Sequence, residues 1–120
     1  MERVTGIGGV FFRARDAEKL RAWYRDHLGI EVDPTWGGYA FKWREPGATV
    51  WSPFAADSSY FPGTYMINYR VADLDAMLAQ LRRGGAQVDE RTEDSPEGRF
   101  GWAIDPDGNR FELWQPPPGG

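Results

Sequence analysis

The sequence INYRVAD at residues 67–73 decides the fold, because it repeats a pattern that VFFRARD sets at residues 10–16. Each copy is a short aliphatic and aromatic run that ends in Asp, a residue type that caps the N-termini of helices. Apolar residues at helical spacing follow both Asp16 and Asp73, and glycine ends each run. The repeat therefore predicts two modules, each opening with a strand that leads into a helix.

Turn-rich and aromatic-rich segments follow both predicted helices, and such segments are typical of strands. The expected strands are residues 38–43 and 48–51 in the first half, and 86–89, 99–104 and 110–114 in the second half. The polar residues 90–99 are expected to form a surface loop, and residues 105–109 a tight turn.

These elements predict an α+β protein built from two tandem βαβββ modules. The predicted boundaries are residues 1–56 for module one, 57–63 for a linker, 64–116 for module two and 117–120 for a flexible tail. A chain of 120 residues suits one domain with a core and a ligand cleft.

Composition excludes several kinds of site. The 14 Lys and Arg residues against 18 Asp and Glu residues, with no basic run, argue against a nucleic-acid partner. The chain has no Cys, and His27 is its single His, so a thiol nucleophile or a site with two imidazoles is impossible. Six Trp, five Tyr and seven Phe residues make aromatic surface its main chemical resource. No membrane span or apolar signal region is present, so a cytoplasmic protein with no membrane partner is expected.

Two motifs in order carry a family resemblance. The first runs from Arg15-Asp16 through WYRDHLG at residues 23–29, and the second is DPDGNRFELW at residues 105–114. With the paired modules, these motifs resemble the vicinal oxygen chelate superfamily, which contains glyoxalase I, extradiol dioxygenases and bleomycin-resistance proteins. The resemblance implies a single glyoxalase/bleomycin-resistance-like domain over residues 1–120, whose curled mixed sheets form a cleft. It also implies a homodimer, with each cleft within one chain or shared between two.

The resemblance places four side chains of metal-dependent members in the cleft. Carried over by the repeat, these positions are Gly9, Thr49, Met66 and Glu112. Only Glu112 is an ordinary ligand for a hard divalent ion, since glycine has no side chain and a thioether is a soft donor. We therefore expect no metal and no cofactor held in the family's manner.

Strand alternation predicts what else faces the cleft, because residues two apart in a strand share a face. The candidate ligand-binding residues are Phe11, Arg13, Thr49, Trp51, Met66, Asn68, Arg70, Arg110 and Trp114. Aromatic walls with a few polar groups are typical of a site for a flat organic ligand.

Glu112 has two interpretations. It is either a structural carboxylate paired with Arg70 or Arg13, or a catalytic general base among aromatic neighbours. The first function hypothesis is metal-independent binding of a small aromatic or heterocyclic molecule. The alternative is a lyase, isomerase or dioxygenase-type enzyme that uses Glu112 as a base or a metal ligand. A domain serving regulation or assembly is a third alternative.

Overall fold

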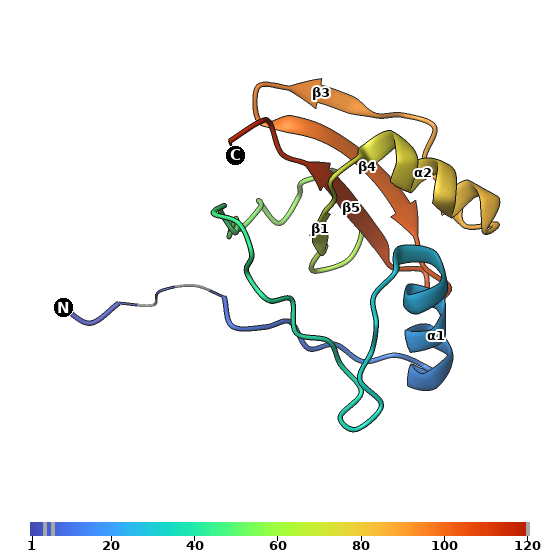
Figure 1. The fold of residues 1–120 in the computed structure, drawn as a ribbon. Coiled ribbons are helices and arrows are strands. Elements are labelled where there is room, and N and C mark those ends of the chain that lie inside the picture. Colours follow the sequence, from blue (N-terminus) through green and yellow to red (C-terminus); the bar gives the residue numbers. More distant parts are fainter. Residues whose placement is uncertain (4, 6, 120) are drawn as a thin grey trace.

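The computed structural model describes residues 1–3, 5 and 7–119, so Gly120 of the predicted tail lies outside the described residues. Its elements in chain order are α1 (Ala17–Leu28), β1 (Asn68–Arg70), α2 (Leu74–Arg83), β2 (Gln87–Val88), β3 (Glu93–Ser95), β4 (Gly98–Ile104) and β5 (Arg110–Gln115). The sheet has the order β1-β5-β4-β2, with β3 also paired to β4, and α2 covers one of its faces (Figure 1). Strand β1 is parallel to β5, and the other pairs are antiparallel.

Both helices begin at the aspartates that the repeat predicts. The Asp16 carboxylate accepts a hydrogen bond from the Lys19 amide at 3.1 Å, and Asp73 accepts one from the Ala76 amide at 3.0 Å. Helix α1 ends at Gly29, whose φ of 69° lies in the left-handed region. The two predicted helices are therefore confirmed, together with their caps.

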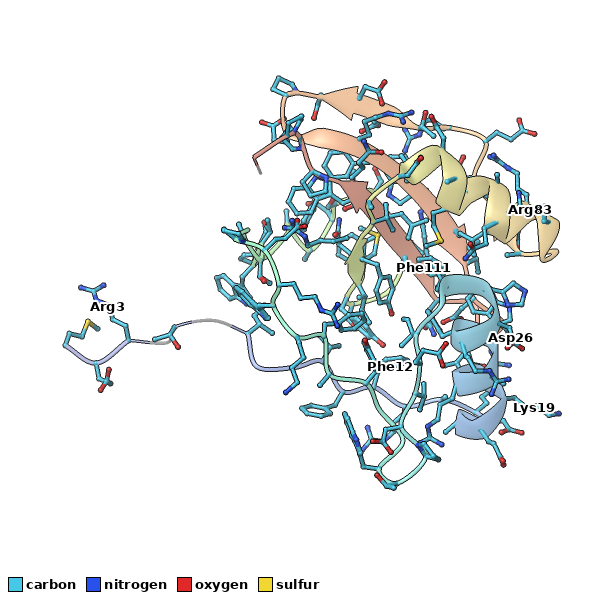
Figure 2. The ribbon with its side chains drawn as sticks, in the orientation of Figure 1. Arg3, Phe12, Lys19, Asp26, Arg83 and Phe111 are labelled. Atoms are coloured by element: carbon cyan, nitrogen blue, oxygen red, sulfur yellow. The ribbon has the colours of Figure 1, made fainter. Side chains whose placement is uncertain are left out.

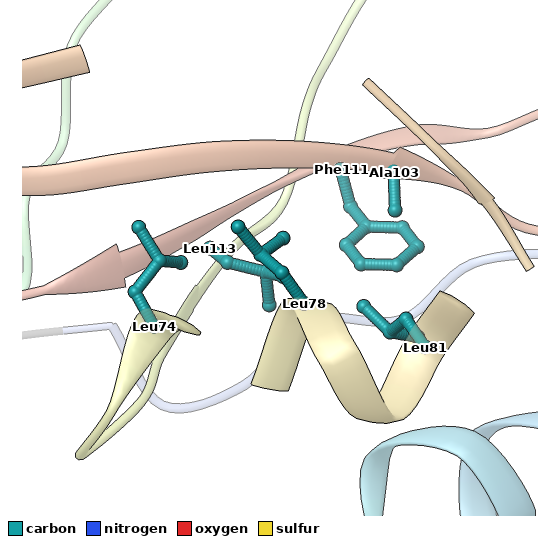
Figure 3. Packing of buried hydrophobic residues seen from close by; sticks show 6 residues of the cluster. All are labelled: Leu74, Leu78, Leu81, Ala103, Phe111 and Leu113. Carbon is teal, nitrogen blue, oxygen red and sulfur yellow. The ribbon is translucent and has the colours of Figure 1, made fainter. Parts of the chain in front are cut away.

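The core lies between α2 and one face of the sheet. Leu74, Leu78 and Leu81 of α2 pack against the buried side chains of Ala103, Phe111 and Leu113 (Figure 3). Because side chains alternate along a strand, the residues of β5 that alternate with Phe111 and Leu113 point away from α2. The opposite face of the sheet is therefore available for other contacts.

The turn at residues 105–109 attaches α1 to the sheet. The buried Asp105 carboxylate accepts hydrogen bonds from the Tyr24 hydroxyl and the Asn109 side-chain amide, both at 2.8 Å. Burial, and then the Tyr69 and Asp105 neighbours, raise the pKa of Tyr24 far above its usual value, so its hydroxyl remains a donor. The two motifs that carry the family resemblance are therefore in direct contact.

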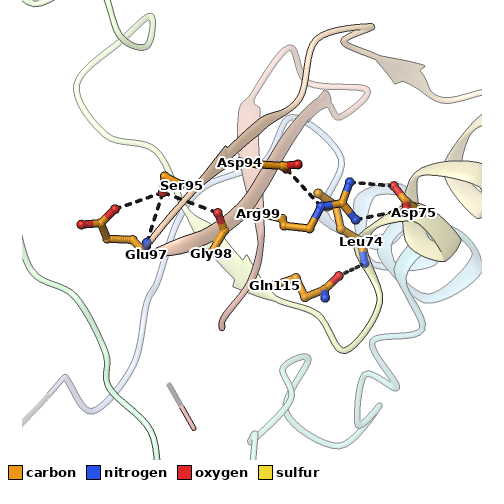
Figure 4. Close-up of polar contacts among 8 residues, drawn as sticks. All are labelled: Leu74, Asp75, Asp94, Ser95, Glu97, Gly98, Arg99 and Gln115. Atoms are coloured by element: carbon orange, nitrogen blue, oxygen red, sulfur yellow. Dashed lines mark hydrogen bonds and ion pairs between the residues drawn. The ribbon is translucent and has the colours of Figure 1, made fainter. Parts of the chain in front are cut away.

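Arg99 ties the sheet to α2 on the other side. Its guanidinium donates to Asp75 of α2 at 3.0 and 3.1 Å and to Asp94 of β3 at 3.0 Å (Figure 4). The Arg99 guanidinium holds the pKa of the Asp75 carboxyl below its usual range. This one side chain joins β4 to both β3 and α2.

Three strand predictions are wrong. The predicted strands at residues 10–13, 38–43 and 48–51 are irregular in the structure. Among the described residues of the first half, the β-type backbone pairing is an isolated bridge between Asp33 and Gly38. A strand needs the backbone groups of a neighbour, and these segments have none in the single chain. The predicted loop at 90–99 instead contains β3, whose exposed polar residues suit an edge strand with water on both faces.

The first half leaves much of its aromatic surface exposed. In Figure 2, Phe12 lies among the irregular segments of the first half, whereas Phe111 lies between the sheet and the helices. The large exposed side chains of this half include Phe11, Trp36, Phe41, Trp43 and Trp51. Among the described residues, no helix has the length and apolar composition needed to span a membrane.

Candidate functional site: a buried carboxylate on the aromatic face of the sheet

Glu112 is the centre of the sheet face that lies opposite α2. It stands in β5 between Trp102 of β4 and Asn68 of β1, and it is paired in register with both. Only 7% of Glu112 is exposed, although it carries a carboxylate. Burying a carboxylate is costly unless hydrogen bonds satisfy it, so its partners define the chemistry of this face.

Three neutral groups donate to the Glu112 carboxylate. The Asn68 side-chain amide donates to Oε1 at 2.7 Å, and the Trp102 indole donates to Oε2 at 3.0 Å. The Tyr60 hydroxyl also donates to Oε2, at 2.6 Å. Burial, and then the Glu112 carboxylate, raise the pKa of Tyr60 well above its ordinary value, so its phenol remains protonated.

The arginine pairing predicted for Glu112 is wrong. Among the described residues, no arginine lies within ion-pair distance of this carboxylate. Arg70 instead lies over the Trp114 ring at 5.2 Å and donates to the Ala48 carbonyl at 3.3 Å, while Arg13 is exposed. An arginine side chain is long enough to reach past its neighbour on the next strand. Alternation along the strand therefore predicted the face of the sheet on which the arginine lies, but not the group that it contacts.

Arg110 likewise has a structural partner. Its guanidinium donates to Asp89 at 2.8 Å and lies 5.6 Å from the Trp102 ring centroid, while Arg91 lies 4.8 Å from the same ring. The Arg110 guanidinium lowers the pKa of the Asp89 carboxyl. These contacts hold the Trp102 ring in place, because two cations and the Glu112 carboxylate all contact its indole.

Trp114 extends the aromatic face along β5. It stacks on Phe100 of β4 with centroids 6.3 Å apart and planes inclined by 12°. Its indole donates to the Glu97 carbonyl at 2.9 Å, which fixes the ring orientation. A flat surface of aromatic rings therefore lies beside the buried carboxylate.

A hollow of about 1000 Å³ lies between β1 and the irregular first half. It brings together four of the predicted ligand-binding residues: Phe11, Thr49, Asn68 and Arg70. Arg13 and Trp51 are exposed and lie outside its lining, as does Met66. Arg110 borders a separate hollow of about 250 Å³ beside Tyr24 and Phe111. The single chain thus gathers the predicted residues into neighbouring groups instead of one cleft.

Tyr60 is the site residue that sequence reasoning missed. It lies in the predicted linker, where no strand or helix pattern draws attention to it. The available signal was the run of aromatic residues Phe54, Tyr60 and Phe61 in a segment otherwise suited to a linker. Aromatic side chains in a linker indicate that the segment packs against something.

The donor set does not fit a divalent metal of the family's type. Of the four positions carried over, Gly9 has no metal-binding side chain, Met66 is a soft donor and Thr49 is a weak neutral one. Both Glu112 oxygens already accept hydrogen bonds. The part of the chain that the structure describes contains no group of three or more His, Cys, Asp or Glu residues placed to hold a metal ion.

Comparison with known protein families shows which family the chain belongs to. A family model described as a glyoxalase-like domain matches residues 9–114. The chain belongs to the glyoxalase-like domain family. The superfamily resemblance inferred from the two motifs is therefore confirmed, although no curated protein matches the chain.

Solved structures resemble this glyoxalase-like domain over most of its length. TnmS3, described as an antibiotic binding protein from Streptomyces sp. CB03234, is 28% identical, with 87% of this chain and 89% of that chain covered and a TM-score of 0.55. A glyoxylase/bleomycin resistance protein/dioxygenase domain from Frankia sp. EAN1pec is 20% identical, with coverage of 98% and 96% and a TM-score of 0.63. The fosfomycin resistance protein FosX from Listeria monocytogenes is 15% identical, with 96% of each chain covered and a TM-score of 0.62. The last two likenesses show the fold alone.

Proposed function

We propose that this glyoxalase-like domain binds a small aromatic or heterocyclic molecule, without a metal, on the aromatic face of its sheet. The observation that carries the proposal is the buried Glu112 carboxylate, which three neutral donors satisfy beside stacked aromatic rings. A mostly apolar surface with one well-placed polar group is typical of small-molecule sites. Similarity to TnmS3, an antibiotic binding protein, supports the same class of function.

Binding requires little from this site beyond what its residues supply. The stacked rings of Phe100 and Trp114 offer flat apolar area, and Glu112 offers a directional acceptor. Neither contribution needs a proton shuttle or a metal. Removal of divalent metal ions from the sample should therefore leave the affinity for the ligand unchanged.

The second candidate function is a lyase, isomerase or dioxygenase-type enzyme. The buried Glu112 carboxylate favours it, because burial is one way in which enzymes tune a carboxylate to act as a general base. Against it, a base needs a lone pair directed at the substrate, and three of the roughly four acceptor positions of the Glu112 carboxylate are already taken by Tyr60, Asn68 and Trp102. Mass spectrometry of recovered ligand separates the two functions, since a binding protein returns its ligand unchanged.

A homodimer completes the proposal. The first half exposes Phe11, Trp43 and Trp51, with 93%, 74% and 78% of their surface accessible, and a second copy is the partner we propose for them. Such a partner would supply backbone pairing for the irregular segments and bring Trp51 toward a binding surface. Sedimentation equilibrium should give twice the mass of the chain, and a monomer at all accessible concentrations would contradict this part.

The central experiment is calorimetric titration with acridine before and after treatment with EDTA. We expect saturable binding that EDTA leaves unchanged, and about tenfold weaker binding for Trp114→Ala, because a stacked ring is lost. The matched variant Trp51→Ala should weaken acridine binding to the same extent if a dimer brings the Trp51 ring to the site, and should leave it unchanged otherwise. Failure of acridine and other planar heterocycles to bind would overturn the proposal, and affinity that vanishes with EDTA would overturn its metal independence.

A further inference from the structure

The three donors to Glu112 differ in how firmly they are held. Trp102 is 1% exposed and belongs to β4, and Asn68 belongs to β1, so the sheet itself carries these two. Tyr60 is 38% exposed and comes from the segment between the two halves. The sheet therefore carries two of the donors, although Asn68 is exposed, and residues 53–63 carry the third.

The segment that carries Tyr60 makes few hydrogen bonds to the sheet. Within the described part of the chain, Tyr60–Glu112 is the one hydrogen bond between residues 53–63 and the sheet. The other hydrogen bonds of this segment are internal, from the Ser58 amide to the Ala55 carbonyl and from the Tyr60 amide to the Ser58 hydroxyl. Few bonds must break for Tyr60 to leave Glu112, so its place can be taken by another donor.

The Tyr60 side chain occupies an aromatic slot. Its ring stacks on Phe54 with centroids 5.4 Å apart and planes inclined by 24°, and it meets the edge of the Trp102 ring at 6.4 Å. At the end of this slot its hydroxyl reaches the Glu112 carboxylate at 2.6 Å, a distance typical of a charge-assisted bond. The site is thus shaped around a phenol, with the ring and the hydroxyl each in contact.

We propose that Tyr60 occupies the position of the ligand, and that the natural ligand is an aromatic molecule whose own phenolic O–H or ring N–H replaces the Tyr60 hydroxyl on Glu112. This inference rests on the proposed binding function and specifies its ligand class. The Glu112 carboxylate acts only as an acceptor in its three hydrogen bonds, so a donor on the ligand is required. An aromatic carboxylate is excluded from the slot, because its charge would face the buried charge of Glu112.

The test compares three probes that share one ring system: 2-naphthol, 2-methoxynaphthalene and 2-naphthoate. Calorimetric titration of the full chain should show about tenfold tighter binding of 2-naphthol than of 2-methoxynaphthalene, since a hydrogen bond to a charged group is gained. Binding of 2-naphthoate should be the weakest. Equal affinities for the three probes would overturn the inference.

The variant Tyr60→Phe tests whether Tyr60 competes with the ligand. Removing only its hydroxyl should tighten 2-naphthol binding by about tenfold. The ligand then no longer competes with Tyr60 for the Glu112 carboxylate, which has lost one donor. The control Tyr65→Phe removes an exposed hydroxyl elsewhere and should leave the affinity unchanged. Unchanged or weaker binding in Tyr60→Phe would show that Tyr60 is a structural residue or a ligand contact.

Failure of this inference and failure of the proposed function give different results. Where acridine binds but 2-naphthol shows no preference over its methyl ether, aromatic binding stands and the ligand class is wrong. Where no aromatic probe binds either the wild type or Tyr60→Phe, both are wrong.

Discussion

The two halves of the chain begin with the same pattern and fold differently. From residue 67 onward the pattern yields β1, α2 and a sheet whose core residues Phe111 and Leu113 are almost fully buried. From residue 10 onward the similar pattern yields α1 and then irregular chain, where Phe11 is 93% exposed. Among the described residues, helices form in both halves and named strands only in the second. A helix satisfies its hydrogen bonds within itself, whereas a strand depends on a neighbour.

The largest expected effect contrasts buried and exposed phenylalanines. Phe111→Ala should lower the free energy of unfolding by about 3–5 kcal/mol, because it leaves a cavity between α2 and the sheet. Phe11→Ala should change it by less than about 0.5 kcal/mol in the monomer, since Phe11 is exposed. Urea denaturation at low protein concentration measures both values. A large effect of Phe11→Ala at high concentration alone would place Phe11 in an interface between copies.

The next effect concerns the contact that joins the two halves. Tyr24→Phe removes one donor from the buried Asp105 carboxylate and should cost about 1–3 kcal/mol of unfolding free energy. The control Tyr39→Phe alters an exposed tyrosine of the first half and should be neutral. Urea denaturation again provides the measurement. Equal effects of the two variants would show that α1 is not held through Asp105.

The matched helix caps give a smaller effect. Asp16→Ala and Asp73→Ala each remove one capping hydrogen bond and should each cost about 1 kcal/mol, because the two geometries are alike. Hydrogen exchange should show faster exchange in the first turn of the corresponding helix. If Asp16→Ala accelerates exchange in α1 but leaves global unfolding unchanged, α1 opens separately from the sheet.

The smallest effect is a pH dependence in the second half. Arg99 lowers the pKa of Asp75 in the folded state, so this carboxylate contributes stability above its unfolded pKa of about 3.9. The contribution is lost as the pH falls through the lower folded value. Asp75→Asn should therefore be less stable than the wild type at pH 7, and the difference should shrink below about pH 4. Thermal unfolding across this range measures it, with the exposed Asp57→Asn as the control.

Sequence patterns predicted both helix starts and much of the second half. The helix starts at Asp16 and Asp73 are as expected, and so is the turn in which Gly108 adopts a φ of 83°. Alternation along β1 and β5 also placed Asn68 and Glu112 on one face. Each of these features depends on residues close in sequence, or on a periodicity that burial of one face imposes.

Sequence patterns were less informative about partners. They offered Arg70 or Arg13 as a structural partner of Glu112, with a catalytic general base as the alternative interpretation. The structure shows Tyr60, Asn68 and Trp102 as the donors to its carboxylate. They also predicted strands in the first half and missed β3, whose polar residues carry no strand pattern. Whether a segment becomes a strand depends on which backbone lies beside it, and composition does not report that.

The sequence by itself determined that the chain is a glyoxalase-like domain, where its helices begin and which face of the second-half sheet is buried. These are local or periodic properties. Only the tertiary structure decided that the carboxylate of Glu112 meets the hydroxyl of Tyr60, across 52 positions of the chain. A hydrogen bond between residues so distant in sequence depends on how the linker returns over the sheet, and no local pattern encodes that path.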